Sequence, residues 1–192
     1  QEKNMTATPP DWNLQGARKD AQSVTHDGQP FARALIDGVV AREVPNMMKG
    51  NGVLTEVFRA DWFENPRPIA QVFQSIIFPG GISAWHAHAL TTDQLFAACG
   101  SVHIVLYDAR THSPTFGQVN EFRVGSYRQA LVIVPPGVWH GVRNFGPDNA
   151  ILLNLVDRAY EYTSPDHWRL PIDTDQIPFR FEGAPRLDAL SR

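Results

Sequence analysis

The side chains best suited to chemistry are two histidines and an aspartate near the middle of the chain. His86 and His88 are separated by one residue, and Asp93 follows after four more. Successive side chains of a β-strand point to opposite faces, so His86 and His88 would share one face of a strand. Two imidazoles side by side form half of a metal site or of an acid–base centre. After a turn, Asp93 would lie beside them on the neighbouring strand.

A second stretch, 135–144, supplies a third histidine. It reads Pro-Pro-Gly-Val-Trp-His-Gly-Val-Arg-Asn, and its histidine is His140. His140 would join the first two histidines if the sheet folds over into a barrel. Together the two stretches resemble the paired signatures of the cupin superfamily, in which Gly80 and Gly100 frame the first motif and Asp93 stands in the usual glutamate place. The resemblance implies an all-β fold of the cupin type, a jelly-roll barrel.

Composition limits the classes of function that need to be considered. The 192 residues, 43% hydrophobic and 19% charged, predict one globular domain with a buried core. A net charge of −3 without a basic block argues against nucleic acid or an anionic membrane as a partner. There is no apolar run of roughly 20 residues to span a bilayer, and the first residues lack an apolar signal core. With Cys99 as the only cysteine, we expect a cytoplasmic protein without an intramolecular disulfide.

Short β-rich segments with glycine and proline between them must position these side chains. The predicted strands cover residues 53–58, 70–78, 82–89, 94–99, 102–107, 119–124, 130–134, 139–144 and 150–156. Gly100 and Ser101 predict a tight hairpin turn. Residues 1–30 are predicted to be a polar N-terminal arm, and 31–192 a single cupin domain in which 32–36 is a short helix or a strand. The final forty residues are expected to wrap the barrel irregularly, with one helical turn at 165–168.

A longer part of the chain carries more specific runs. These are Gly-Val-Leu-Thr-Glu-Val-Phe-Arg at 52–59, Leu-Tyr-Asp-Ala-Arg at 106–110, Ser-Pro-Thr-Phe-Gly at 113–117 and the tail at 164–173. With them the chain resembles the dTDP-4-dehydrorhamnose 3,5-epimerase family over about residues 50–182. Members of that family epimerise a nucleotide-linked 4-keto sugar without a metal. In them a histidine removes the proton beside the ketone, a lysine steadies the enolate oxygen, and a tyrosine exchanges a proton on the other face.

The resemblance assigns roles to particular residues of this chain. The catalytic histidine corresponds to His86 or His88, and the tyrosine to Tyr160 or Tyr162. Asp173 matches the acidic residue that pairs with the catalytic histidine, where a carboxylate would fix the imidazole tautomer and raise its basicity. The alternatives are that the tyrosines pack at the barrel mouth and that Asp173 belongs to a solvated loop.

The chain departs from the family at the lysine. That position, seven residues before the hairpin glycine, holds Asp93, and a carboxylate would repel an enolate. Asp93 also completes a set of three imidazoles and one carboxylate with His86, His88 and His140, as in metal-binding cupins. Such a set suits Fe(II), Mn(II), Ni(II) or Zn(II), and we expect no organic cofactor. Alternatively, the short Asp93 side chain orients a histidine without touching the metal, or closes a turn.

Other polar residues carry weaker signals. Arg143 and Arg128 are the candidates for contact with an anionic substrate, although most arginines simply lie on the surface, and the family's arginine for diphosphate is absent. The remaining histidines belong to no recognisable constellation: His26, His103, His112 and His167.

Three functions compete at this point. The first is a sugar-type epimerase or isomerase that abstracts a proton beside a carbonyl, on a nucleotide-linked keto sugar and with or without a metal. The second is a metal-dependent cupin oxygenase or hydrolase, and the third is a metabolite-binding cupin without turnover. In each case the ligand is a small molecule, and neither nucleic acid nor a membrane is expected. We also expect a homodimer, in which residues 1–50 reach a neighbouring subunit.

Overall fold

The computed structural model describes residues 14–20, 22–27 and 34–183. The chain divides into two units, Gln1–Ala34 and Leu35–Arg192, which we describe separately. In the first unit the described residues form turns and irregular backbone, including a turn in which the Ala17 amide donates to the Leu14 carbonyl. The predicted arm and its boundary at residue 30 lie partly outside the described residues and stay predictions.

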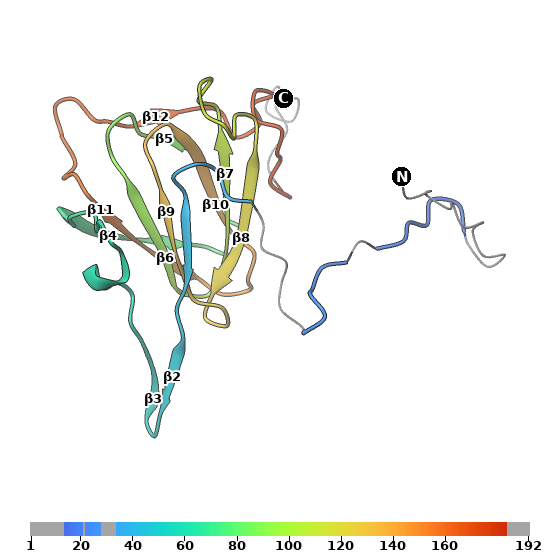
Figure 1. Ribbon diagram of the computed structural model, residues 1–192, viewed down its shortest axis with the longest axis horizontal. Helices are drawn as coiled ribbons and strands as arrows, with labels where there is room; N and C mark the ends of the chain where they lie inside the picture. Colours follow the sequence, from blue (N-terminus) through green and yellow to red (C-terminus); the bar gives the residue numbers. More distant parts are fainter. Residues whose placement is uncertain (1–13, 21, 28–33, 184–192) are drawn as a thin grey trace. The chain divides into compact units, whose positions relative to one another are not determined.

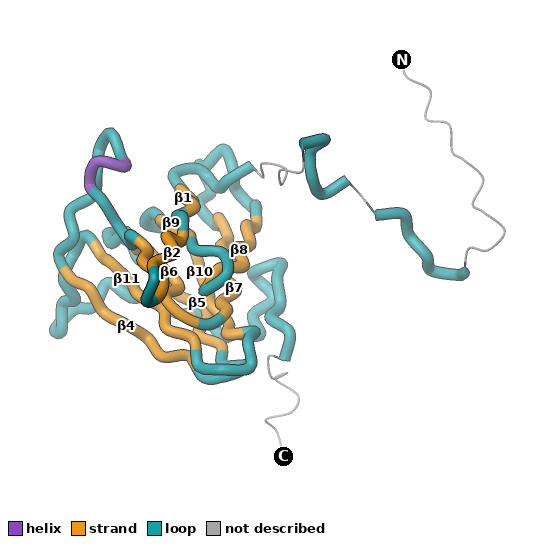
Figure 2. Tube along the Cα trace, turned by 90° about the horizontal axis from the view of Figure 1, so that it is seen from below, coloured by secondary structure: helices purple, strands orange, loops and turns teal. Residues whose placement is uncertain are grey.

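Almost all regular structure of the second unit is β-strand (Figure 2). Two five-stranded antiparallel sheets pack face to face (Figure 1). The order in the first sheet is β1 (Val40–Glu43), β9 (Ala130–Val134), β6 (Asp93–Cys99), β11 (Ala150–Val156) and β4 (Gln71–Ile77). The order in the second sheet is β12 (Trp168–Arg169), β5 (Ile82–Ala87), β10 (Val138–Asn144), β7 (Ser101–Asp108) and β8 (Val119–Gly125). All nine predicted strands are present, eight of them within these two sheets, which form an open jelly-roll sandwich.

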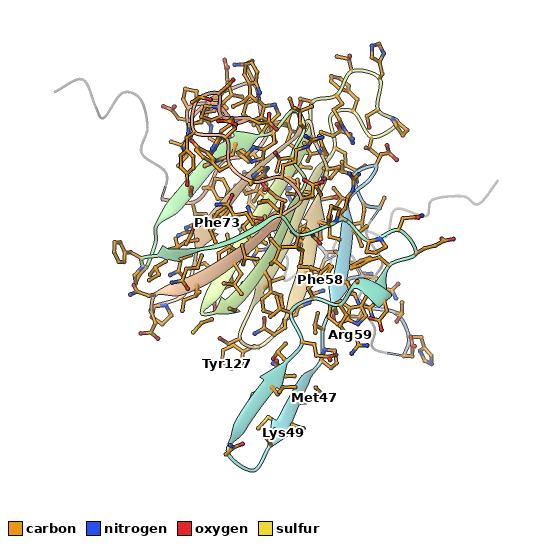
Figure 3. The ribbon with its side chains drawn as sticks, turned by 90° about the vertical axis from the view of Figure 1, so that its left-hand side faces the viewer. Met47, Lys49, Phe58, Arg59, Phe73 and Tyr127 are labelled. Atoms are coloured by element: carbon orange, nitrogen blue, oxygen red, sulfur yellow. The ribbon has the colours of Figure 1, made fainter. Side chains whose placement is uncertain are left out.

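A hairpin and one short helical turn lie outside the two sheets. The hairpin pairs β2 (Asn46–Lys49) with β3 (Gly52–Thr55) and projects from the sandwich (Figures 1 and 3). The 3-10 turn η1 spans Ala60–Trp62. Strands β1 and β2 were not predicted, because their short exposed segments lack a clear alternation. Within the described ranges, no helix is long and apolar enough to cross a membrane.

The main core lies between the two sheets. Leu95 and Val132 from the first sheet meet Ile104 and Leu106 from the second, and all four are almost completely buried. Each belongs to a strand whose neighbouring residues face the other way, so that alternate side chains fill the interior. This packing holds the two sheets at a fixed separation, which the side chains of the site must span.

The turn at Gly100 corrects one prediction. Strand β6 belongs to the first sheet and β7 to the second, so Gly100 carries the chain from one sheet to the other and does not form a hairpin. Gly100 has φ +80°, and a Cβ there would lie 2.7 Å from the Ala150 Cα. The backbone conformation and the close approach of Ala150 both require glycine here. In the sequence, such a glycine cannot be distinguished from one in a hairpin turn.

The C-terminal segment wraps the outer face of the second sheet, as predicted. Trp85 on β5 is fully buried there, with its ring 5.2 Å from that of Phe181 and 6.2 Å from that of Phe179. The helical turn expected at 165–168 is wrong, because Trp168 and Arg169 extend and pair with the edge of β5 as β12. An open strand edge offers backbone hydrogen bonds that outweigh a weak local preference for a turn.

Candidate active site

A cavity of about 770 Å³ opens between the two sheets. Strands β4, β6 and β11 form one wall, strands β5 and β10 form the opposite wall, and the segment 158–169 contributes the rest. Its lining combines apolar side chains, such as Phe73 and Leu152, with a concentrated group of histidines and acidic residues. A mostly apolar cavity with convergent polar groups is the usual form of a small-molecule site.

The predicted cluster gathers on one side of this cavity. His86 and His140 are register partners on the neighbouring strands β5 and β10, and their ring centroids lie 5.9 Å apart. The centroids of His88 and His140 lie 5.4 Å apart. Asp93 reaches the same place from the opposite sheet, so its predicted position on the strand next to the histidines is wrong. The loop after His88 crosses between sheets, which sequence spacing alone does not reveal.

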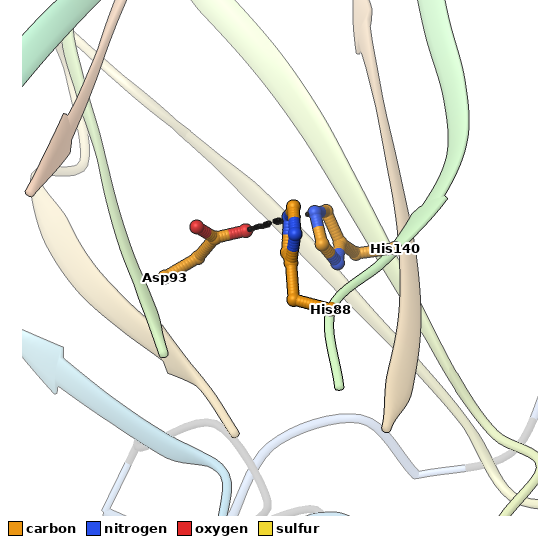
Figure 4. Close-up of side chains that lie close together, drawn as sticks. All are labelled: His88, Asp93 and His140. Carbon is orange, nitrogen blue, oxygen red and sulfur yellow. Dashed lines mark ion pairs between the residues drawn. The ribbon is translucent and has the colours of Figure 1, made fainter. Parts of the chain in front are cut away.

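The Asp93 carboxylate faces two imidazoles (Figure 4). Its Oδ2 atom is 3.2 Å from Nε2 of His88 and 3.0 Å from Nε2 of His140. Neither nitrogen is aligned with Oδ2 as a hydrogen-bond donor, so these are ion-pair contacts, and Oδ2 is buried without a hydrogen bond from the described residues. The other oxygen, Oδ1, accepts a hydrogen bond of 3.0 Å from the Asn154 amide. Asn154 therefore orients the carboxylate so that Oδ2 faces the histidines.

Backbone carbonyls fix the tautomers of both histidines. Nδ1 of His88 lies 2.5 Å from the carbonyl oxygen of Asp166, and Nδ1 of His140 lies 3.3 Å from that of Val138. A carbonyl can only accept, so each Nδ1 carries a hydrogen and each neutral ring would direct an Nε2 lone pair at Asp93. Two lone pairs and a carboxylate repel one another unless a proton or a cation lies among them.

The contacts within this cluster shift the pKa values of Asp93 and His88 in opposite directions. Burial opposes ionisation of Asp93, but its contacts with His140 and His88 outweigh burial and lower the pKa of the carboxyl group. Burial likewise disfavours the charged form of His88, but the contact with Asp93 outweighs it and raises the pKa of the imidazole. The cluster therefore favours a negative Asp93 with positive charge beside it.

His86 has a different environment. Its Nδ1 lies 2.8 Å from Nε2 of His167, and its Nε2 lies 3.2 Å from Oγ of Ser83. Burial, followed by the neighbouring His140 and His167, lowers the pKa of His86 to about 3. His86 is consequently neutral near pH 7, so one of its ring nitrogens keeps a lone pair. The ligand atoms that lie within 4.8 Å of one another come from His88, Asp93 and His140, and the place of His86 in a metal site stays a prediction.

Asp166 and His167, which immediately precede β12, also belong to the site, and the sequence analysis assigned neither of them to it. We expected no constellation around His167, but its ring is tilted against two others, with its centroid 4.9 Å from that of His86 and 5.1 Å from that of His88. The Asp166 carboxylate accepts hydrogen bonds from the amides of residues 89–91 and from the Thr91 hydroxyl, at 2.7–3.0 Å. The available signal was the run Ser-Pro-Asp-His at 164–167, in which three turn-forming residues precede a histidine.

The arginines of the cavity are not those expected. Arg158 and Arg169 line it. Arg143 instead contacts Glu182 at 3.3 Å, and Arg128 pairs with Glu43 on the surface. Neither Arg143 nor Arg128 is among the described residues that line the cavity, and their role in substrate binding stays a prediction.

Of the predicted tyrosine and aspartate, Tyr160 lines the cavity, whereas Asp173 is not among the described residues that line it. Tyr160 lies on the cavity wall, 48% exposed, with its ring 5.3 Å from that of Tyr162 and its amide bonded to Gln71 of β4. Asp173 is not among the described cavity-lining residues, and its carbonyl accepts a hydrogen bond from Arg180. Within the described chain, the contact of His86 Nδ1 is with His167, so a catalytic role for Asp173 stays a prediction.

The Ser-Pro-Thr-Phe-Gly run serves the fold. Asp108 is completely buried, and its carboxylate accepts hydrogen bonds from Arg110, from Ser113 and from Thr115 at 2.5–2.9 Å. Burial opposes the charge, but the bonds from Arg110 and the two hydroxyls lower the pKa of Asp108. The run therefore anchors the loop after β7.

Comparisons with known proteins agree with this arrangement. A family model described as dTDP-4-dehydrorhamnose 3,5-epimerase matches residues 33–181. The chain is 33% identical over 139 residues to the probable low-salt glycan biosynthesis epimerase Agl13 of Haloferax volcanii, which covers 72% of this chain and 89% of that protein. It is 31% identical over 148 residues to the spore coat polysaccharide biosynthesis protein SpsL of Bacillus subtilis, covering 77% and 97%.

Solved structures show the same architecture. The dTDP sugar isomerase of Desulfovibrio desulfuricans superposes with a TM-score of 0.71 at 28% identity, covering 78% of this chain and 94% of that one. NovW of Streptomyces spheroides, a 4-keto-6-deoxy sugar epimerase, superposes with a TM-score of 0.71 at 21% identity over 80% of each chain and shares the fold. The chain belongs to the dTDP-4-dehydrorhamnose 3,5-epimerase family, whose members are carbohydrate epimerases of the cupin type.

Proposed function

We propose that this protein epimerises a nucleotide-linked keto sugar by removing a proton beside the ketone, with His86 as the base. The observation that carries the proposal is a partly buried imidazole, held between His167 and Ser83, on the wall of a cavity large enough for a sugar. Its Nε2, near Ser83, is the nitrogen left to accept a proton when Nδ1 is engaged with His167. Family membership supports the reaction class, and the solved dTDP complexes of ChmJ from Streptomyces bikiniensis support the substrate class.

Epimerisation needs a second proton donor on the other face of the enolate. Tyr160 fits this role, because its backbone is tied to Gln71 of β4 in the first sheet, whereas His86 belongs to the second. A phenol across the cavity from an imidazole places one proton source on each side of a planar intermediate. In this scheme His86 removes the proton and Tyr160 delivers the new one.

The enolate also needs positive charge, which the family's lysine supplies and Asp93 does not. We propose that His88, Asp93 and His140 together hold a divalent transition metal. The residues fit such an ion: Oδ2 of Asp93 is buried without a hydrogen bond in the described structure, and both Nε2 atoms face it. Carbonyls on the two Nδ1 atoms are the usual outer partners of metal-binding histidines. A cation there would act as a Lewis acid towards an enolate oxygen.

Solvent exchange tests the reaction. The protein is incubated with dTDP-linked 4-keto sugars in heavy water, and deuterium at the carbons beside the ketone is followed by NMR. We expect incorporation with wild type, a loss of at least about a hundredfold with His86→Asn, and no change with the matched control His112→Asn, an exposed loop histidine. Wild-type exchange in His86→Asn, or none with wild type on any such sugar, would overturn the proposal.

Elemental analysis tests the metal separately. Protein produced with Fe, Mn, Ni and Zn available should retain about one transition ion per chain. His140→Ala and Asp93→Ala should lose it, whereas His86→Asn should keep it, because His86 lies outside the three-residue group. Wild-type protein without a stoichiometric ion, or Asp93→Ala with one, would contradict the metal site while leaving the role of His86 intact.

We also propose a homodimer, with a second copy of this chain covering the exposed apolar surface of the hairpin and β4. Met48 and Val53 on the hairpin and Val72, Ile76 and Phe78 along β4 are 54–77% exposed. Strand β4 is also a sheet edge, whose free backbone groups can pair with another chain. Light scattering should give a dimer for wild type and a monomer for Met48→Glu combined with Ile76→Lys. A monomeric wild type would refute the assembly.

A further inference from the structure

His167 is the one residue in the described part of the chain that contacts Nδ1 of the proposed base. Its Nε2 lies 2.8 Å from Nδ1 of His86, closer than Oγ of Ser83 lies to Nε2 of the same ring. Two ring nitrogens at this distance share one hydrogen, so one of them donates and the other accepts. The identity of the donor decides which nitrogen of His86 can take a proton from a substrate.

Two arrangements satisfy the contacts. If His167 donates, His86 carries its hydrogen on Nε2, which then donates to Ser83 and has no lone pair for a substrate proton. If His86 donates from Nδ1, Nε2 keeps its lone pair, to which the Ser83 hydroxyl donates in the resting protein and which becomes free when that hydroxyl rotates away. A hydroxyl rotates to suit either case, so His167 makes the choice.

We propose that His167 is the positioning residue of the base: its Nε2 accepts the Nδ1 hydrogen of His86 and so holds Nε2 of His86 ready to accept a proton. This inference rests on the proposed function of His86. When His86 takes a proton on Nε2, it becomes an imidazolium that still donates from Nδ1. With His167 as acceptor, the hydrogen bond at Nδ1 is the same in the neutral and the charged form of His86, and it strengthens as the charge develops.

The backbone on both sides of His167 is fastened to the elements that carry the other histidines. On its N-terminal side, the Asp166 carboxylate holds the amides of residues 89–91, and the Asp166 carbonyl holds Nδ1 of His88. On its C-terminal side, Trp168 and Arg169 pair with Ala87 and His86 of β5. His167 is thus positioned relative to His86 by two independent attachments, which is the precision a supporting residue needs.

The resemblance to the family implies a carboxylate, Asp173, at this place, and here an imidazole stands in contact with the base. A neutral acceptor fixes the tautomer as a carboxylate does, but it adds no negative charge beside His86. The groups that face His86 from the surrounding elements are His140 of β10, His88 of β5, Arg169 of β12 and Ser83. None of these can accept the Nδ1 hydrogen at the observed contact distance.

Nitrogen-15 NMR of the histidine rings tests the proposal on the resting protein, without substrate. We expect His86 to be the Nδ1–H tautomer in wild type and a mixture of tautomers in His167→Phe, with the spectrum of His112→Phe unchanged. An Nε2–H tautomer of His86 in wild type would overturn the proposal, whether or not the protein proves to be an epimerase. This measurement stands even if a variant fails to fold.

Kinetics distinguish positioning from a structural role. His167→Phe should lower kcat by roughly 10–100-fold with KM within about twofold, and it should keep the metal content of wild type. His167→Asp, which restores an acceptor, should recover at least about tenfold of that loss. Equal loss in the Phe and Asp variants, or a wild-type kcat for His167→Phe, would show that His167 does not orient the base.

Discussion

Replacing Asp93 by Asn removes the charge at the centre of the site and keeps its volume. The side chain is 2% exposed and lies 3.2 and 3.0 Å from the Nε2 atoms of His88 and His140. Removing one partner of a buried ion pair leaves the other charge uncompensated, at a typical cost of about 3–5 kcal/mol. Because His88 is 15% exposed and partly screened, we expect the free energy of unfolding of the metal-free protein to fall by about 3 kcal/mol near pH 5.5.

The pH dependence of this loss follows from the two pKa shifts. The pKa of Asp93 is lowered in the folded protein, so its contribution is present above the unfolded value of about 4 and is lost as pH falls further. The pKa of His88 is raised, so its contribution is complete below about 6.5 and is lost as pH rises through the folded value. The difference between wild type and Asp93→Asn should therefore be largest between about pH 4 and 6.5 and shrink towards pH 9.

Urea denaturation of chelator-treated protein at several pH values measures this difference directly. Asp148→Asn, which changes an exposed aspartate, is the matched control and should leave the curve unchanged. A difference that grows with pH, or an Asp93→Asn variant as stable as wild type at pH 5.5, would refute the assigned charges. In either case His88 would not be the positive partner of Asp93.

Three further predictions concern the fold and the cavity. Asp108→Asn should lower the free energy of unfolding by about 3 kcal/mol, because it weakens a completely buried network of charged hydrogen bonds. Gly117→Ala should lower the free energy of unfolding by about 1 kcal/mol, because Gly117 has φ +82° but open space around it. Gly100→Ala should lower it by about 1–3 kcal/mol more, because its Cβ would meet Ala150. Denaturant unfolding curves of the two variants measure the difference. Arg158→Met should raise KM for an anionic sugar nucleotide about tenfold without a change in kcat, whereas the exposed Arg123→Met should not.

Local sequence patterns were sufficient for most of the sandwich. Alternation and breakers placed nine strands, because each strand has one face in the core and period-2 patterning records that directly. The patterns do not record which sheet a strand joins. Asp93 was therefore expected on the strand next to the histidines, although it reaches them from the opposite sheet, and Gly100 was interpreted as a hairpin although it carries the chain between sheets.

The part of the site that escaped prediction depends on tertiary pairing. His167 reaches His86 only because residues 168 and 169 add a strand to the edge of β5, and nothing local in the sequence indicates that pairing. The same segment brings Arg169 to the cavity, whereas Arg143, which adjoins a recognised motif, points to Glu182. The two histidine motifs meet because their strands, β5 and β10, pair and place His86 opposite His140. The arginines that line the cavity, Arg158 and Arg169, come from the C-terminal segment, which no motif marks.

The two departures from the family pattern are best understood together as a redistribution of charge. The family pattern puts a lysine beside the enolate and a carboxylate beside the base, whereas this chain puts a carboxylate at the lysine position and an imidazole against His86. A divalent cation together with the Asp93 carboxylate carries one net positive charge, as lysine does. Such an ion would restore the positive charge that proton abstraction needs at the enolate, and a neutral His167 would then let His86 act as the base without a second buried carboxylate.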